Sequence, residues 1–222
     1  MRRIEALLCD LDGTICDSEW AHIEAWELVV RGHGFELDEG WDLDYVGKPD
    51  DFAAVRMRER YPSLPPAKDL LAERHGAYRK IIAEHSDRVS YPGVAEALEK
   101  LAAAGIKLAV GTNSPWDNTI AALRAAGIER FFPVIVAYGM TPRGKPAPDL
   151  YVEAALRLDV DPAVCAVVED TPIGIDAGKA AGAFVVAVTT TNTRDALVDA
   201  DIVLDSPAAA MNWILDNARG VP

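Results

Sequence analysis

The chain has 222 residues, of which 50% are hydrophobic and 26% are charged, so it is long enough to bury a core and its composition excludes wholesale disorder. Its 35 acidic and 22 basic side chains give a formal net charge of −13, which argues against binding to nucleic-acid phosphates or to an anionic membrane. Three widely spaced cysteines, the absence of a membrane-spanning apolar run and an N-terminus unlike a signal peptide predict a protein of the reducing cytoplasm.

The first predicted elements are a short strand and a long helical segment. The strand covers Ile4–Cys9, and helical patterns follow at Ala21–Arg31, Phe52–Arg60 and Leu70–Ala83. Strong strand patterns are missing from this segment, and a proline-rich turn separates its last two helices. We therefore interpret residues 16–91 as a helical insertion into a second domain that is formed by residues 1–15 and 92–222.

From residue 92 onward, short apolar runs alternate with helical patterns. Several of the runs are rich in valine and isoleucine, as is typical of parallel strands that are buried on both faces. The runs are Ile106–Val110, Val134–Ala137, Cys165–Val168, Ala183–Val188 and Ile202–Leu204, and a last helix is predicted at Ala208–Asn217. Such alternation predicts an α/β fold with a doubly wound, Rossmann-like parallel sheet.

Two carboxylates follow the first strand. Asp10 comes directly after Cys9, and Asp12 is followed by glycine. In an open α/β sheet, ligands bind beyond the carboxyl ends of the strands, where two acids can act as nucleophile and as general acid or base. Asp and Gly also favour ordinary turns, so this motif alone leaves both interpretations open.

A second motif, Gly111-Thr112-Asn113-Ser114-Pro115, follows the strand at 106–110. Ser114 is predicted to cap a helix that has Pro115 at its first position, with Asp117 completing the capping pattern. Free backbone N–H groups at such a helix start can bind an anion, and the Thr112 hydroxyl adds a donor. The alternative is a well-capped helix without a ligand.

Two further motifs follow later strands. Lys145 lies between a glycine and two prolines in Gly144-Lys145-Pro146-Ala147-Pro148, which places a cation on a stiff loop. Glu169 and Asp170 end the strand at 165–168, before a predicted Thr171 N-cap. Adjacent carboxylates without a neighbouring histidine or cysteine favour Mg²⁺ over Zn²⁺. Together, these groups supply what phosphoryl transfer requires.

These four motifs, in this order, resemble the signatures of the haloacid dehalogenase superfamily, in its phosphatase and β-phosphoglucomutase-like subfamily. They are Asp10-x-Asp12-Gly-Thr, Thr112, Lys145 and Glu169-Asp170, and the resemblance covers essentially the whole chain. It implies that the insertion is a helical cap of the C1 type, which closes over the site and selects the leaving group.

The resemblance also implies a role for each residue. Asp10 attacks phosphorus to form an aspartyl-phosphate, and Asp12 protonates the leaving alcohol and then activates water. Mg²⁺ binds the Asp10 carboxylate, the Asp12 backbone carbonyl and Asp170, with Glu169 assisting. Thr112, the Asn113 amide and Lys145 hold the phosphoryl group. An acid at position 12 points to phosphoryl transfer, since dehalogenases of the family lack it.

His22, Trp26 and Lys48 are the candidates in the insertion for contact with the substrate. His22 either faces the pocket or lies on the outer helix face, Trp26 either contacts the substrate or packs inside the insertion, and Lys48 either binds or is solvated. The expected partner is a small phosphate ester, and the expected assembly is a monomer.

The predicted function is therefore Mg²⁺-dependent hydrolysis of a small phosphorylated metabolite. One alternative is a mutase resembling β-phosphoglucomutase, and His22 favours it because that group carries a histidine at the matching position. Asp50, Asp51 and Pro115 disfavour it, because they stand where such mutases carry basic residues that hold a second phosphate. Another is phosphonoacetaldehyde hydrolysis, which needs a lysine of the insertion as a Schiff base. The third is a non-catalytic binding protein.

Overall fold

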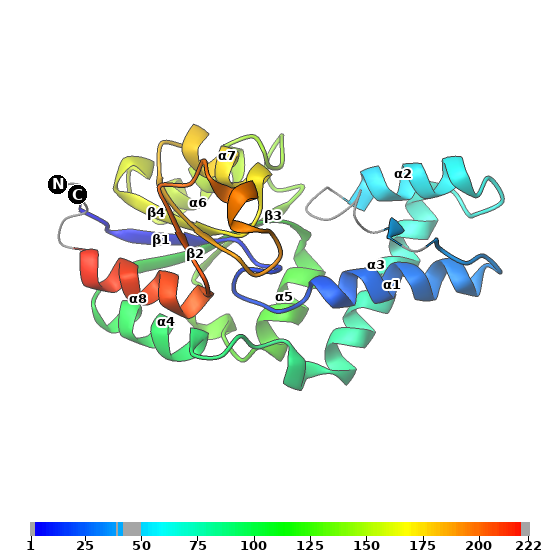
Figure 1. The fold of residues 1–222 in the computed structure, drawn as a ribbon, viewed down its shortest axis with the longest axis horizontal. Helices are drawn as coiled ribbons and strands as arrows, with labels where there is room; N and C mark the ends of the chain where they lie inside the picture. The colour runs from blue at the N-terminus through cyan, green and yellow to red at the C-terminus, as the bar shows by residue number, and fades with distance from the viewer. Residues whose placement is uncertain (1–2, 39, 42–49, 219–222) are drawn as a thin grey trace.

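The computed structural model describes residues 3–38, 40–41 and 50–218, and it is built around a six-stranded parallel sheet (Figure 1). The strand order is β3-β2-β1-β4-β5-β6, and each neighbouring pair is parallel. The strands are β1 (Ala6–Cys9), β2 (Lys107–Pro115), β3 (Val134–Tyr138), β4 (Cys165–Glu169), β5 (Phe184–Val188) and β6 (Ile202–Leu204). The predicted doubly wound α/β fold is confirmed.

Helices cover both faces of this sheet, because its strands bury side chains on both sides. On one face lie α6 (Asp149–Arg157) and α7 (Pro172–Ala180). On the other lie α4 (Val94–Ala103), α5 (Trp116–Ala125) and α8 (Pro207–Asn217). Every residue of β1 and β4 is buried, which explains their unbroken apolar sequence. Short 3₁₀ turns lie at Ser86–Arg88, Glu129–Phe131, Pro162–Val164 and Arg194–Leu197.

The strand register brings the carboxyl ends of the three central strands to one edge. Cys9, the last residue of β1, is paired with Val110 of β2 on one side and with Val168 of β4 on the other. The residues that follow these positions therefore meet at the edge where ligands bind in open α/β sheets.

β2 differs from the sequence-based prediction at its carboxyl end. It continues to Pro115, which pairs with Tyr138 of β3 after a shift in register, and α5 begins only at Trp116. The N-cap position of α5 is Pro115, and no side chain caps the helix there. The predicted N-cap role of Ser114 is therefore wrong. Its hydroxyl donates a hydrogen bond to Asp12 instead.

The insertion consists of α1 (Glu19–Gly32), α2 (Asp50–Arg60) and α3 (Ala67–Glu84), which lie together to one side of the sheet (Figure 1). These helices pack around an apolar cluster of their own that includes Trp26, Val30, Met57 and Leu70. Helix α3 also packs against α5. The exact residues at which the two predicted domains divide stay a prediction.

The chain enters and leaves the insertion at adjacent points. Cys16 and Ser90 form an isolated antiparallel bridge, and the Asp17 backbone N–H donates to the Val89 carbonyl over 2.8 Å. Within the described ranges, no helix is both long and apolar enough to cross a membrane.

Candidate active site

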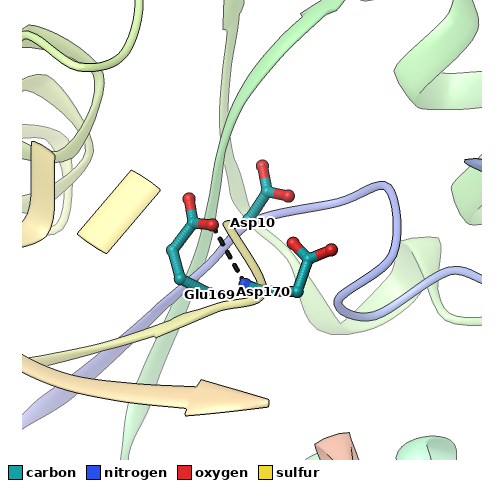
Figure 2. Close-up of side chains that lie close together, drawn as sticks. All are labelled: Asp10, Glu169 and Asp170. Atoms are coloured by element: carbon teal, nitrogen blue, oxygen red, sulfur yellow. Dashed lines mark hydrogen bonds between the residues drawn. The ribbon is translucent and has the colours of Figure 1, made fainter. Parts of the chain in front are cut away.

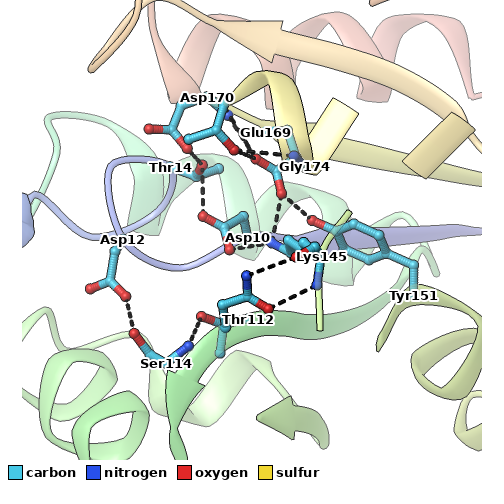
Figure 3. Close-up of polar contacts among 12 residues, drawn as sticks. Asp10, Asp12, Thr14, Thr112, Ser114, Lys145, Tyr151, Glu169, Asp170 and Gly174 are labelled. Atoms are coloured by element: carbon cyan, nitrogen blue, oxygen red, sulfur yellow. Dashed lines mark hydrogen bonds and ion pairs between the residues drawn. The ribbon is translucent and has the colours of Figure 1, made fainter. Parts of the chain in front are cut away.

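Asp10, Lys145, Glu169 and Asp170 meet beyond the carboxyl ends of β1 and β4 (Figure 3). The side chain of Lys145 is only 3% exposed, and its ammonium donates to Asp10 Oδ1 and, over 2.6 Å, to Glu169 Oε1. The sequence predicts these four residues from three separate motifs, and the structure places them in one buried cluster.

The carboxylates of Asp10, Glu169 and Asp170 can each offer one oxygen to the same point, since these oxygens all lie within 4.8 Å of one another (Figure 2). Burial raises the pKa of Asp10 to about 7, even though Lys145 lowers it, and the nearby carboxylates add to the rise. Burial, Asp10 and Glu169 also raise the pKa of Asp170. A buried set of oxygen donors that repel one another fits a hard divalent cation such as Mg²⁺.

Hydroxyl groups hold Asp170 in place. Thr14 Oγ1 donates to Asp170 Oδ1 over 2.8 Å, and Thr191 Oγ1 donates to Asp170 Oδ2. The Asn192 amide donates to the Asp170 carbonyl over 2.9 Å. Thr191 and Asn192 belong to the polar run that follows β5, so a fifth strand end contributes to the site.

Both oxygens of Glu169 accept hydrogen bonds. Oε1 accepts from Lys145 and, over 2.6 Å, from the hydroxyl of Tyr151 on α6. Oε2 accepts from the Asp170 backbone N–H and from the hydroxyl of Thr171, each over 3.1 Å. Thr171 also accepts from the Gly174 N–H, so the predicted N-cap of α7 is confirmed. These donors make Glu169 a fixed counter-ion for Lys145.

Thr112 and Asn113 lie on β2, beside the Lys145 loop. Thr112 is buried, and its Oγ1 accepts from the Ser114 backbone N–H over 3.0 Å. The Asn113 side-chain oxygen accepts from the Lys145 backbone N–H over 2.9 Å. A Cβ at Gly144 would lie 2.5 Å from that oxygen, so glycine is needed for this close approach. The two motifs are thereby tied to each other.

Asp12 has different surroundings, because side chains of the insertion contact it. Ser18 and Ser114 each donate to its carboxylate over 2.5 Å, and the Tyr78 hydroxyl of α3 donates over 3.2 Å. His22 Nε2 of α1 lies 3.0 Å from Asp12 Oδ1. Burial alone would raise the pKa of Asp12, but His22 and the two serine hydroxyls outweigh it and lower that pKa strongly.

Of the two positions predicted for His22, the pocket and the outer helix face, the structure shows the first. Its ring stacks on Tyr78 with the centroids 4.2 Å apart, and its Nδ1 contacts the buried guanidinium of Arg74. Burial and Arg74 oppose protonation of His22, but the Asp12 carboxylate outweighs them and raises the pKa of the imidazole. The insertion therefore places a histidine with a raised pKa against Asp12.

The other two candidates in the insertion have different outcomes. Trp26 is buried in the apolar cluster of the insertion, so it packs inside this cluster, and the prediction that it contacts substrate is not supported. Trp26 shares this cluster with Val29 and Val30 of the same helix, and burial of its large apolar ring there is favourable. Lys48 lies outside the described residues.

Several site residues escape the sequence analysis. They are Thr14, Ser18, Arg74, Tyr78, Tyr151, Thr191 and Asn192. The polar run after β5 is a usable signal, because polar residues also follow the apolar runs that end at Cys9 and Val168. Tyr78 and Arg74 lie on a regular helix of the insertion and carry no comparable signal.

Comparison with known proteins agrees with this geometry. The haloacid dehalogenase-like hydrolase family matches residues 4–182. Validoxylamine A 7'-phosphate phosphatase of Streptomyces hygroscopicus subsp. limoneus is 34% identical over 89% of this chain and 91% of its own length. The β-phosphoglucomutase of Bacillus subtilis is 30% identical over 83% of each chain.

Solved structures show the same fold. The structure of CbbY from Rhodobacter sphaeroides in complex with phosphate superimposes with a TM-score of 0.84 at 28% identity, covering 94% of this chain and 99% of that one. The family predicted from the four motifs is confirmed, as is the expected enzyme class of phosphatase. The chain belongs to the haloacid dehalogenase-like hydrolase family, among phosphatases and β-phosphoglucomutase-like proteins.

Proposed function

We propose that the chain is a Mg²⁺-dependent phosphomonoester hydrolase that acts on a small phosphorylated metabolite through an aspartyl-phosphate on Asp10. The observation that carries this proposal is the buried cluster in which Lys145 contacts Asp10 while three carboxylates converge on one point. Relatives that are phosphatases of phosphorylated small molecules support it.

In the first step, a carboxylate oxygen of Asp10 attacks phosphorus, and the bond between phosphorus and the ester oxygen breaks. The leaving alkoxide takes a proton from Asp12. This step requires Asp12 to carry a proton when the substrate is bound, so the contact with His22 that lowers the pKa of Asp12 must weaken before it. In the second step, water attacks the phosphorus of the aspartyl-phosphate and gives a proton to Asp12, which restores Asp10 and releases inorganic phosphate. Lys145, Thr112 and the Asn113 backbone N–H hold the phosphoryl oxygens.

The cation would be held by Asp10, Asp170 and the Asp12 backbone carbonyl. When bound, Mg²⁺ offsets the negative charge of the carboxylates and of the phosphoryl group. Glu169 would assist these ligands without being one of the main ones, because its oxygens already accept hydrogen bonds from Lys145, Tyr151 and the Asp170 backbone N–H. The formal net charge of −13 makes the local cations the source of attraction for an anionic substrate.

A sugar-phosphate mutase is the second candidate. The contact of His22 with Asp12 and the similarity to β-phosphoglucomutase favour it. Asp50, Asp51 and Pro115 oppose it, because they offer no cation for a second phosphate group. Hydrolysis of phosphonoacetaldehyde and a purely binding role have no comparable support among the described residues.

The test measures phosphate release from a panel of phosphorylated metabolites, with Mg²⁺ and with EDTA, for the wild type and for Asp10→Asn. We expect release that requires Mg²⁺ and falls by about 10³-fold or more in the variant, as for the loss of a catalytic nucleophile. Conversion of glucose 1-phosphate in the presence of a bisphosphate primer, without phosphate release, would instead establish the mutase. No turnover of any ester by folded protein would overturn both.

A further inference from the structure

Tyr151 is a buried side chain at the site to which the proposed chemistry assigns no role. It is the third residue of α6, the helix that follows the Lys145 loop, and it is completely buried. The ammonium of Lys145 lies over its ring, 4.9 Å from the ring centroid, and the tyrosine hydroxyl donates to Glu169 Oε1 over 2.6 Å (Figure 3).

The three groups form a closed set of contacts. The Glu169 oxygen that accepts from Tyr151 also accepts from Lys145, again over 2.6 Å. The Tyr151 ring attracts the ammonium through its face, as in cation–π pairs, while its hydroxyl orients the carboxylate that opposes the ammonium. One side chain of α6 therefore contacts Lys145 directly and also fixes its counter-ion.

The neighbouring backbone leaves room for this arrangement. A Cβ at Gly111 would lie 3.0 Å from two carbon atoms of the Tyr151 ring, which is closer than such contacts normally are. A Cβ at Gly174 would lie 1.9 Å from the Glu169 carboxylate. Neither glycine has a positive φ, so the space that they leave, and not backbone strain, accounts for them.

We propose that Tyr151 is a positioning residue, which holds the Lys145 ammonium at the place where it binds the phosphoryl group. The inference rests on the proposed function, because it takes Lys145 to be the phosphate-binding cation. Without the hydroxyl, Glu169 Oε1 loses a strong donor, and the ammonium is free to shift toward Glu169 and away from the substrate.

The experiment compares Tyr151→Phe with the wild type, using Tyr61→Phe as the matched control. The control substitution also removes a hydrogen-bonded hydroxyl, but the Tyr61 hydroxyl donates to the Glu36 carbonyl in the insertion and not to a residue of the site. For Tyr151→Phe we expect KM and the inhibition constant of inorganic phosphate to rise together by about tenfold, in the range known for groups that orient site residues. The kcat is expected to change less than about threefold, as for the loss of uniform binding.

A double-mutant cycle with Lys145→Met separates positioning from simple packing. If Tyr151 acts through Lys145, adding Tyr151→Phe to Lys145→Met leaves the affinity for inorganic phosphate unchanged, so the two effects are not additive. Additive losses would overturn the proposal, as would a single variant that lowers Tm but retains the wild-type KM and inhibition constant. If Lys145→Met does not fold, the comparison of KM with kcat in the single variant decides.

Direct binding of inorganic phosphate, measured by calorimetry in the presence of Mg²⁺, separates this proposal from the proposed function. A wild type that turns over no ester but binds phosphate more tightly than Tyr151→Phe would refute the hydrolase and support the positioning role. Equal phosphate affinity in the two proteins, including none in either, would refute the positioning role.

Discussion

Asp10 and Asp12 are separated by one residue, but they depend on different parts of the molecule. The partners of Asp10 are Lys145, on the loop after β3, and the carboxylates at the end of β4, all of which lie outside the insertion. Most partners of Asp12, namely Ser18, His22 and Tyr78, belong to the insertion or to its entry. The exception is Ser114 of β2, whose hydroxyl also donates to Asp12. The pKa of Asp10 is raised to about 7, whereas that of Asp12 is strongly lowered.

This difference indicates how the two carboxylates can have separate roles. The sheet alone produces a crowded anionic cluster at Asp10, whose repulsion a cation relieves. The pKa of Asp12 is lowered by His22 of the insertion, with a further contribution from Ser114 of β2, so loss of the His22 contact would raise the proton affinity of Asp12. Substitutions near Asp10 and substitutions near Asp12 are therefore expected to have separate effects.

The largest effect is expected from Gly174→Ala, which acts on the Asp10 side. The added methyl group would lie 1.9 Å from the Glu169 carboxylate, so Glu169 must leave its place between Lys145 and Tyr151. We expect the free energy of unfolding to fall by about 3 kcal/mol, as for severe overpacking, and phosphate release to fall by about 100-fold. Thermal melts and initial rates measure both.

Gly76→Ala is the control for this substitution. Gly76 lies inside α3, and an added Cβ would meet no heavy atom within 4 Å. Replacing an open helical glycine is expected to raise stability by about 0.5–1 kcal/mol and to leave the rate unchanged. Equal behaviour of the two variants would contradict the close fit around Glu169.

The next effect concerns Mg²⁺ and pH. If Mg²⁺ binds the ionised carboxylate of Asp10, as the proposed function requires, protonation of Asp10 below its pKa of about 7 competes with the metal. We expect the affinity for Mg²⁺ at pH 5.5 to be about 30-fold weaker than well above pH 7, because only about one in thirty Asp10 side chains with this pKa is ionised at pH 5.5. Calorimetric titrations at several pH values measure it. A pH-independent affinity would show that Asp10 is not a ligand.

The same pKa predicts a trend in the metal-free protein. The folded-state pKa of Asp10 lies above its ordinary value, so its contribution to stability is fully present at low pH and is lost as pH rises through about 7. Asp10→Asn is expected to remove this loss, so that the metal-free variant is the more stable protein at pH 8. Melting curves of both proteins in EDTA test this point.

The smallest effect is expected from His22→Gln, which acts on the Asp12 side. The pKa of His22 is raised, so its contribution to stability is present at pH 5.5 and is lost as pH rises through that raised pKa. We expect a cost of about 2 kcal/mol at pH 5.5 and a smaller one at pH 9. The control is His33→Gln, whose partner Glu73 is exposed, and it should cost less than about 0.5 kcal/mol.

The sequence is sufficient to predict the strands and the carboxylates Asp10, Glu169 and Asp170, because both depend on local patterns. A buried parallel strand is a continuous apolar run, and the polar residues after Cys9, Val110 and Val168 lie at the same sheet edge whatever else the chain does. Asp10, Glu169 and Asp170 are brought together for this reason, and Lys145 joins them from the loop after β3.

The surroundings of Asp12 are beyond such reasoning. Ser114 satisfies the local pattern of an N-cap, but pairing of Pro115 with Tyr138 extends β2, and a carboxylate 102 positions away takes the hydroxyl. Tyr78 is separated from Asp12 by 66 positions, on a helix whose spacing indicates only that one face is buried. A single hydroxyl in a helix does not reveal a partner that only the tertiary fold supplies.

The bridge between Cys16 and Ser90 has a consequence for how such a chain can diversify. The insertion starts and stops at neighbouring points, so its length and content are geometrically independent of the strand order. A different segment whose ends are equally close could join the same two points without disturbing the sheet. The sheet edge that carries Asp10 and the insertion are thus separable parts of the chain, so under the proposed function a new specificity can arise when the insertion is exchanged and the sheet is kept.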